Sequence, residues 1–158
     1  MVKVAELLDR AKAQGVTIAT AESCTGGMVS AALTDVPGSS AVVERGFVTY
    51  SNSAKEEMLG VSAETLAAHG AVSEEVAREM AAGALARSGA NLAVSVTGIA
   101  GPGGSEFKPE GRVCFGVAQE SADPKAETVE FGPLGRDQVR LAARDHALAL
   151  LSEAVTEA

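Results

Sequence analysis

Ser23 is the first residue whose type and place in the sequence favour chemistry. It follows a short β-branched segment, 16–20, which has the pattern of a strand, and it precedes a helical apolar pattern that begins at Met28. A serine at such a strand-to-helix turn has its hydroxyl raised above the edge of a sheet, where a substrate can reach it. We therefore predict Ser23 as a catalytic nucleophile.

Thr25, Gly26 and Gly27 continue this turn to the start of the helix. The first amides of a helix have no partner within it, so these amides can converge at the place where an oxyanion forms. Glycines there also let a substrate approach the backbone closely. The three residues are predicted to bind substrate. The alternative is that Ser23 or Thr25 only caps the helix.

Lys55 follows the second β-rich segment, 42–49. Ser53 and Glu56 have the S-x-x-E spacing of a helix capping box, which places Lys55 in the first turn of a helix. The positive end of the helix dipole, together with burial, lowers the pKa of a lysine at such a place. A neutral amine can accept the proton of Ser23 without histidine or metal, as in Ser-Lys hydrolases. The alternative is an ordinary solvated lysine.

The longest loop of the sequence, 97–105, begins after a third predicted strand, 92–96. The Thr97 hydroxyl and the Gly98 amide are predicted to lie beside Ser23, and the glycines after them are typical of an anion-holding nest. Thr97 is a candidate catalytic residue and Gly98 a candidate substrate-binding residue. The alternative is a connecting loop without function.

Tyr50 and Arg140 complete the set of candidates. Tyr50, the only tyrosine, precedes Lys55 by five residues and is predicted to orient it or to stack on a ring, although strand-end tyrosines often only pack. Arg136, Arg140 and Arg144 recur every four residues near the end of the chain. Like charges at this spacing destabilise a helix unless an anion or acidic neighbours offset them, so the row is either an anion site or a solvated face.

The cysteines and histidines predict neither a metal site nor a disulfide. Cys24 and Cys114 have no CxxC spacing, and His69 and His146 have no carboxylate or cysteine at ligand spacing. Cys24 is interpreted as a small buried neighbour of Ser23 rather than as the nucleophile. The sequence thus predicts chemistry without metal or cofactor.

Alternating helices and strands must position these residues. Helical patterns run from Val4 to Gly15, from Met28 towards Pro37, through Leu59 and Leu66, onward from Ser73, and from about Arg136 to the end. Strand patterns cover 16–20, 42–49, 92–96, 112–119 and 128–131. This order predicts an α/β fold, a three-layer α/β/α sandwich around a mixed, mostly parallel sheet, in one domain over residues 1–158. The three candidate loops then gather at one edge of the sheet.

Composition and charge exclude several partners. The 158 residues are 46% apolar, enough for one continuous core. With 13 basic and 21 acidic residues the net charge is -8, which repels a phosphate backbone and predicts no nucleic-acid partner. The sequence has neither the apolar run of a signal peptide nor a stretch of membrane-spanning length, so we expect a cytoplasmic protein with no membrane partner.

Four segments of the sequence, in the same order, closely resemble the CinA C-terminal domain family. They are 20–27, 45–52, 69–73 and 97–102, and the resemblance covers nearly the whole chain. It implies a three-layer α/β/α sandwich. It also implies the activity of a nicotinamide-nucleotide amidohydrolase, which turns nicotinamide mononucleotide and water into nicotinate mononucleotide and ammonia.

The resemblance further implies residue roles. The family's nucleophilic serine falls on Ser23 and its lysine on Lys55. Its supporting threonine and arginine fall on Thr97 and Arg140, and its tyrosine falls on Tyr50 by motif. The implied partner is a small-molecule substrate, a phosphorylated nicotinamide nucleoside, and no cofactor is implied.

The phosphate of such a substrate needs local cations because the protein as a whole is acidic. Arg140 is the first candidate, with Arg112 or Lys108 behind it. A domain this small is also expected to form a homo-oligomer, most simply a dimer that completes the site. Two alternatives stay open: a noncatalytic pyridine-nucleotide-binding regulatory module, and a Ser-Lys amidase for another small amide.

Overall fold

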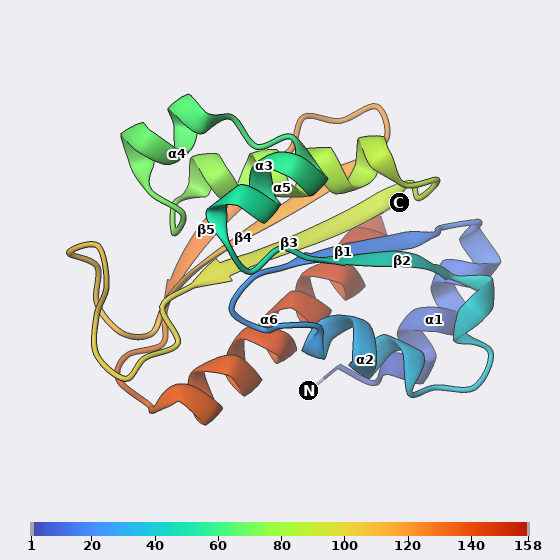
Figure 1. Cartoon of the computed structure of the whole chain (residues 1–158). Coiled ribbons are helices and arrows are strands. Elements are labelled where there is room, and N and C mark those ends of the chain that lie inside the picture. The colour runs from blue at the N-terminus through green and yellow to red at the C-terminus, as the bar shows by residue number, and fades with distance from the viewer. Residues whose placement is uncertain (1, 158) are drawn as a thin grey trace.

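A five-stranded sheet forms the centre of the structure, a computed structural model that describes residues 2–157 (Figure 1). Its strands are β1 (Ile18–Glu22), β2 (Val43–Val48), β3 (Leu92–Gly98), β4 (Arg112–Gln119) and β5 (Lys125–Glu130). Their order across the sheet is β2-β1-β3-β4-β5. β1 pairs in parallel with β2 and β3, whereas β4 is antiparallel to β3 and β5. The sheet is therefore mixed, with β4 reversed relative to the other four strands.

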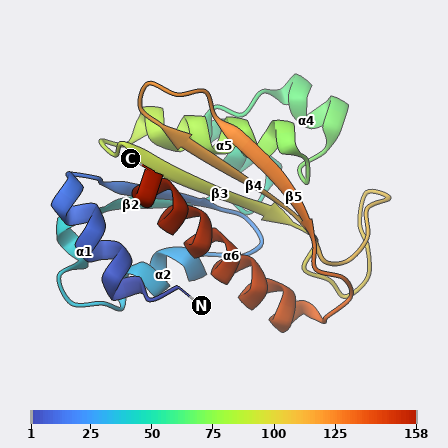
Figure 2. The ribbon, with the colours of Figure 1, turned by 180° about the vertical axis from the view of Figure 1, so that it is seen from behind.

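Helices cover both faces of this sheet (Figures 1 and 2). One face carries α1 (Val4–Gln14), α2 (Met28–Thr34) and α6 (Arg136–Glu157). The other face carries α3 (Asn52–Leu59), α4 (Ala63–His69) and α5 (Glu74–Arg87). A single 3-10 turn, η1 (Ser39–Ala41), precedes β2. The predicted α/β/α sandwich is confirmed. Within residues 2–157, no helix is both long enough and apolar enough to cross a membrane.

Two apolar clusters hold these layers together, one on each face of the sheet. Ile18 lies with Leu7 of α1 and Leu151 of α6, whereas the adjacent Ala19 lies with Met80 of α5. All five side chains have no exposed surface. Successive side chains of a strand point to opposite faces, so a central strand buried on both sides has a continuous rather than an alternating apolar pattern.

The first strand lies two residues later than its sequence pattern predicts. α1 ends at Gly15, whose positive φ of 70° closes the helix, and the strand then runs from Ile18 to Glu22 rather than over 16–20. Pairing with β3 explains the extension, because Glu22 is in register with Val96. The β1 strand therefore continues to the residue directly before Ser23.

The capping box predicted at Ser53 is wrong. Ser51 is the N-cap of α3, and its hydroxyl accepts a hydrogen bond of 3.1 Å from the amide of Ala54. Lys55 therefore lies one residue beyond the first turn, with the pattern S-x-x-A at the cap. A serine with extended backbone caps a helix by itself, so the glutamate of a capping box is not required.

Parallel pairing brings the predicted loops to one edge of the sheet. β1, β2 and β3 point the same way, so the turn at Ser23, the segment 49–52 and the loop after Gly98 all leave from their carboxyl ends. This edge is where ligands bind in open α/β sheets. The three segments are 25 or more residues apart in the sequence, so only the sheet brings them together.

A glycine sets the distance between α3, which carries Lys55, and α5. A Cβ atom at Gly83 of α5 would lie 1.9 Å from the carbonyl oxygen of Leu59 at the end of α3. Backbone cannot yield to such an overlap as a flexible side chain can. The absence of a side chain at Gly83 therefore lets α3 approach α5.

We predict that Gly83→Ala destabilises the protein. Helix propensity alone favours alanine over glycine by about 1 kcal/mol, but overpacking against Leu59 costs about 1–3 kcal/mol or more. The free energy of unfolding, measured by urea denaturation, should fall. Ala86→Gly on the exposed side of α5 is the control for propensity alone. A Gly83→Ala protein more stable than wild type would contradict this packing.

Candidate active site

Ser23 and Lys55 meet at the edge of the sheet. The Ser23 amide donates a hydrogen bond of 2.9 Å to the carbonyl of Val96, which extends β1 into the turn. The Lys55 ammonium or amine donates to the Ser23 Oγ over 3.1 Å. Both side chains also reach the main-chain carbonyl of Tyr50, from Nζ at 3.3 Å and from Oγ at 3.4 Å. The structure thus brings together a hydroxyl and an amine that are 32 residues apart in the chain.

Burial lowers the pKa of Lys55. The side chain is only 1% exposed. Burial lowers the pKa of Lys55 below its ordinary value of 10.5, and the nearby carboxylate of Glu106 opposes this effect to a smaller extent. The structure therefore favours the neutral amine, which can accept a proton from Ser23.

Cys24 is not a competing nucleophile at neutral pH. Burial raises the pKa of its thiol to about 12, so the group stays protonated. Its side chain is buried beside Ser23. This position agrees with the interpretation of Cys24 as a small apolar neighbour.

A cavity of about 340 Å³ opens over Ser23 and Lys55. Its walls come from the turn after β1, the start of α3, the segment before α5 and the loop after β3. The lining residues include Ser23, Cys24, Tyr50, Asn52, Lys55, Val72, Thr97, Gly98, Gly101, Glu106 and Arg136. Among the residues predicted from sequence, Ser23, Lys55, Tyr50, Thr97 and Gly98 all lie on its wall.

Thr97 and Gly98, at the end of β3, line the cavity. Thr97 is buried, and its hydroxyl donates to the carbonyl of Ala71 over 2.9 Å, which ties β3 to the segment before α5. A Cβ atom at Gly98 would lie 2.7 Å from a methyl group of Val113 on the paired strand. Close packing against Val113 therefore excludes a side chain at this position.

Tyr50 and Arg136 lie at the mouth of the cavity. Tyr50 is 61% exposed, and its hydroxyl accepts a hydrogen bond of 2.9 Å from the Arg136 guanidinium. The same guanidinium donates to the carbonyl of Gly101 over 2.6 Å. Sequence analysis noted Arg136 only as one of a row of three arginines. Arg136 is the first residue of α6. Its position at the start of the predicted helix could have indicated that it lies near the loops at the edge of the sheet.

Thr25, Gly26 and Gly27 of the turn, and Arg140 of α6, do not line the cavity. The Thr25 hydroxyl is buried and donates to the carboxylate of Glu22 over 2.6 Å. The Gly26 amide donates to the Ser23 carbonyl over 3.0 Å. Arg140 donates from Nε to the carbonyl of Cys24 over 3.0 Å and from Nη2 to that of Thr25 over 3.4 Å. These hydrogen bonds hold the backbone of the turn.

The second-choice cations for a phosphate also have partners elsewhere. Lys108 donates from Nζ to the carbonyls of His69 and Val72, over 2.7 Å and 2.6 Å. Arg112 pairs with Glu130 over 2.6 Å. Arg136 is thus the arginine that lines the cavity within the described part of the chain.

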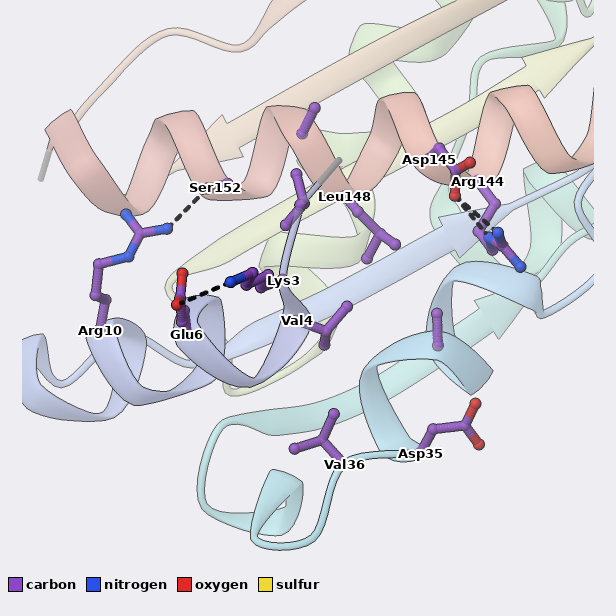
Figure 3. Close-up of a pocket in the computed structure, with 13 residues that line it drawn as sticks. Lys3, Val4, Glu6, Arg10, Asp35, Val36, Arg144, Asp145, Leu148 and Ser152 are labelled. Atoms are coloured by element: carbon purple, nitrogen blue, oxygen red, sulfur yellow. Dashed lines mark hydrogen bonds and ion pairs between the residues drawn. The ribbon is translucent and has the colours of Figure 1, made fainter.

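A larger hollow of about 810 Å³ lies between α1, α2 and α6 and shares no residue with the Ser23 cavity (Figure 3). Both of its arginines have partners: Arg144 pairs with Asp145 over 2.8 Å, and Arg10 donates to the Ser152 hydroxyl over 2.7 Å. Nothing in this hollow resembles a nucleophile and a base in contact. Elsewhere too, within residues 2–157, no three His, Cys, Asp or Glu side chains converge as metal ligands.

Comparison with known proteins identifies the family of the chain. The model of the family described as "CinA C-terminal domain" matches residues 2–155. The chain belongs to the CinA C-terminal domain family. Among its relatives, nicotinamide-nucleotide amidohydrolase PncC of Escherichia coli K12 is 55% identical over 141 residues, covering 89% of this chain and 85% of that protein.

Other relatives in the family are longer. A CinA-like protein of Chloroherpeton thalassium is 63% identical over 116 residues, which are 73% of this chain but 27% of that protein. The chain thus spans about a third or less of the length of the CinA-like relatives that it matches.

Solved structures of the family share the fold over nearly the whole chain. The competence/damage inducible protein CihA of Agrobacterium tumefaciens is 49% identical, with a TM-score of 0.88, covering 97% of this chain and 95% of that one. A CinA superfamily protein of Klebsiella pneumoniae is 36% identical, with a TM-score of 0.91, covering 99% and 100% of the two chains.

We predict that Lys55→Met stabilises the protein at neutral pH. In the wild type the folded pKa of Lys55 lies below the unfolded one, so the unfolded chain binds more protons between the two values and stability rises with pH across that window. The advantage of Lys55→Met should therefore shrink as pH rises towards 10.5. The gain in the free energy of unfolding at neutral pH should be roughly 1.4 kcal/mol for each pH unit by which the folded pKa lies below the unfolded one.

Urea denaturation at a series of pH values measures this effect. Lys12→Met, which changes an exposed lysine of α1, is the control and should show no such window. An equal pH dependence in Lys55→Met and wild type would mean that Lys55 keeps an ordinary pKa.

Proposed function

We propose that the protein hydrolyses the carboxamide of nicotinamide mononucleotide to nicotinate mononucleotide and ammonia. One observation carries this proposal: a buried lysine with a lowered pKa contacts a serine hydroxyl on the wall of a cavity. This pair is the Ser-Lys form of an activated nucleophile. The name of the E. coli relative supplies the substrate class, a nicotinamide nucleotide.

In the first half of the reaction, neutral Lys55 removes the proton from Ser23 as the Ser23 oxygen attacks the carboxamide carbon. The negative oxygen of the resulting intermediate needs amide donors. Since the Gly26 amide is already bonded to the Ser23 carbonyl, we assign this role to the backbone at Cys24 and Gly98, both of which line the cavity. The Lys55 ammonium then gives its proton to the departing nitrogen, which leaves as ammonia.

In the second half, water attacks the acyl ester on Ser23. Lys55 accepts a proton from that water and returns one to the Ser23 oxygen, so that the acid is released and the enzyme is restored. Thr97 keeps the cavity wall in place through its bond to the carbonyl of Ala71. Every proton in this cycle passes through Lys55, which is close enough to Ser23 for direct transfer.

The phosphate of the substrate requires a cation at the cavity mouth. We propose Arg136 for this role because it lines the cavity, with Tyr50 beside it to stack on the substrate ring. Arg140 was the first candidate from sequence for binding the phosphate. In this proposal it instead holds the backbone of the Ser23 turn. We also propose that the protein forms a homodimer, which sedimentation or light scattering can test.

We predict that Ser23→Ala abolishes ammonia release from nicotinamide mononucleotide by the purified, chelator-treated protein. Lys55→Ala should lower kcat by about 10²–10⁴-fold, because the general base is lost. Lys12→Ala, at an exposed position of α1, should leave the rate unchanged. Folded wild-type protein that binds the nucleotide without turnover would favour a regulatory binding module instead. Turnover of another amide alone would favour a different amidase.

We predict that Arg136→Ala raises KM for nicotinamide mononucleotide by about 10–100-fold, the value of one charge-assisted hydrogen bond. KM for nicotinamide riboside, which has no phosphate, should change little. Arg144→Ala is the control, since Arg144 pairs with Asp145 in the separate hollow of Figure 3. An equal rise in KM for both substrates would show that Arg136 does not bind the phosphate.

A further inference from the structure

Glu22 places a carboxylate next to the nucleophile, yet neither the sequence candidates nor the proposed reaction use it. The side chain is 1% exposed. One oxygen accepts from the Thr25 hydroxyl at 2.6 Å and from the Val29 amide at 2.9 Å, and the other accepts from the Ser30 amide at 3.0 Å. A buried carboxylate with three donors is a built arrangement rather than an accident of packing.

These bonds supply a helix cap that the local sequence lacks. The N-cap of α2 is Gly27, which has no side chain, so the amides of Val29 and Ser30 need another acceptor. Glu22 reaches across the whole turn to provide it. The first amides of α2 are therefore satisfied by the protein's own carboxylate.

The main chain of Glu22 joins the turn to the segment that meets Lys55. Its carbonyl accepts from the Thr49 amide at 2.9 Å. The next residue, Tyr50, offers the carbonyl that both Ser23 and Lys55 approach. Glu22 is thus bonded on one side to the start of α2 and on the other to the segment beside the catalytic pair.

Arg140 holds the same turn from its other side. It donates to the carbonyls of Cys24 and Thr25, while Glu22 accepts from the Thr25 hydroxyl. Arg140 therefore holds the carbonyls of Cys24 and Thr25, and Glu22 holds the hydroxyl of the same Thr25. Neither group lines the cavity.

We propose that Glu22 is a positioning residue for the nucleophile: its buried carboxylate fixes the turn so that the Ser23 oxygen stays in contact with Lys55. The inference rests on the proposed function for its kinetic readout, but reactivity of Ser23 towards a probe tests it independently. Misplacement of a reacting group by about 1 Å costs on the order of 100-fold in rate. Glu22 acts through Ser23 and not on the substrate.

Two variants separate this role from a loss of stability. Glu22→Ala removes all three acceptor contacts. Glu22→Gln keeps the shape of the side chain and one acceptor oxygen. Its NH₂ group, however, is a donor that faces a backbone N–H, so one hydrogen bond is lost.

The matched control is Glu79→Ala. Glu79 accepts from the Ser62 amide at 2.8 Å and from the Thr65 hydroxyl at 2.6 Å, at the start of α4. It is a similar cap that does not line the Ser23 cavity.

The experiment measures kcat and KM for nicotinamide mononucleotide, and the rate at which a fluorophosphonate labels Ser23, at a temperature where thermal melts show each variant folded. We expect kcat and the labelling rate of Glu22→Ala to fall by on the order of 100-fold, with KM within about twofold. Glu22→Gln should lose about tenfold. Glu79→Ala should match wild type in both rates, however much stability it loses. If Glu22→Ala does not fold, Glu22→Gln decides.

Labelling of Glu22→Gln at the wild-type rate would overturn the proposal, as would an equal loss in Glu79→Ala. A wild type that is labelled at Ser23 but does not hydrolyse the nucleotide would refute the proposed substrate, and the labelling rates alone would then decide the role of Glu22.

Discussion

The burial of the Lys55 amine against the Ser23 hydroxyl is the interaction on which the rest of the site depends. A lysine is expensive to remove from water, and proteins do so when its neutral form is useful. Here the amine is almost fully covered and contacts a hydroxyl and one carbonyl. The fold thus accepts an unfavourable group in its interior, and burial lowers the pKa of that group below its ordinary value.

Several structural features follow from this constraint. α3 has to approach the sheet closely enough to bury Lys55, and the missing side chain of Gly83 allows α5 to lie against the end of α3. β1 has to end at Glu22 so that the next residue faces the amine. Parallel pairing of β1 with β2 and β3 places the three loops at one edge, where no local sequence signal could bring them together.

The groups around the Ser23 turn divide into those that line the cavity and those that do not. Away from the cavity, Glu22 accepts hydrogen bonds from the first amides of α2, and Arg140 donates to a backbone carbonyl of the turn. The cavity itself is lined by the loop after Gly98, by Tyr50 and by Arg136. An anionic ligand in this cavity would therefore meet Arg136 rather than the first amides of α2, which Glu22 already occupies, although the start of a helix is itself a common anion site.

The sequence by itself determined the alternation of helices and strands and the strand-to-helix turn at Ser23, and it singled out Ser23 and Lys55, which the structure places in contact. These are read from periodicity and from turn residues, which act over a few neighbouring positions. Two local predictions failed. Pairing with β3 extends the first strand to Glu22, and Ser51 rather than Ser53 caps α3.

Only the tertiary structure decided which side chains face the cavity. Arg136 and Arg140 have the same spacing pattern, but one lines the mouth and the other holds the turn. The Thr25 hydroxyl and the Glu22 carboxylate bind each other inside the protein rather than a ligand. The direction of a side chain and its access to water depend on elements distant in the chain, and no local pattern contains that information.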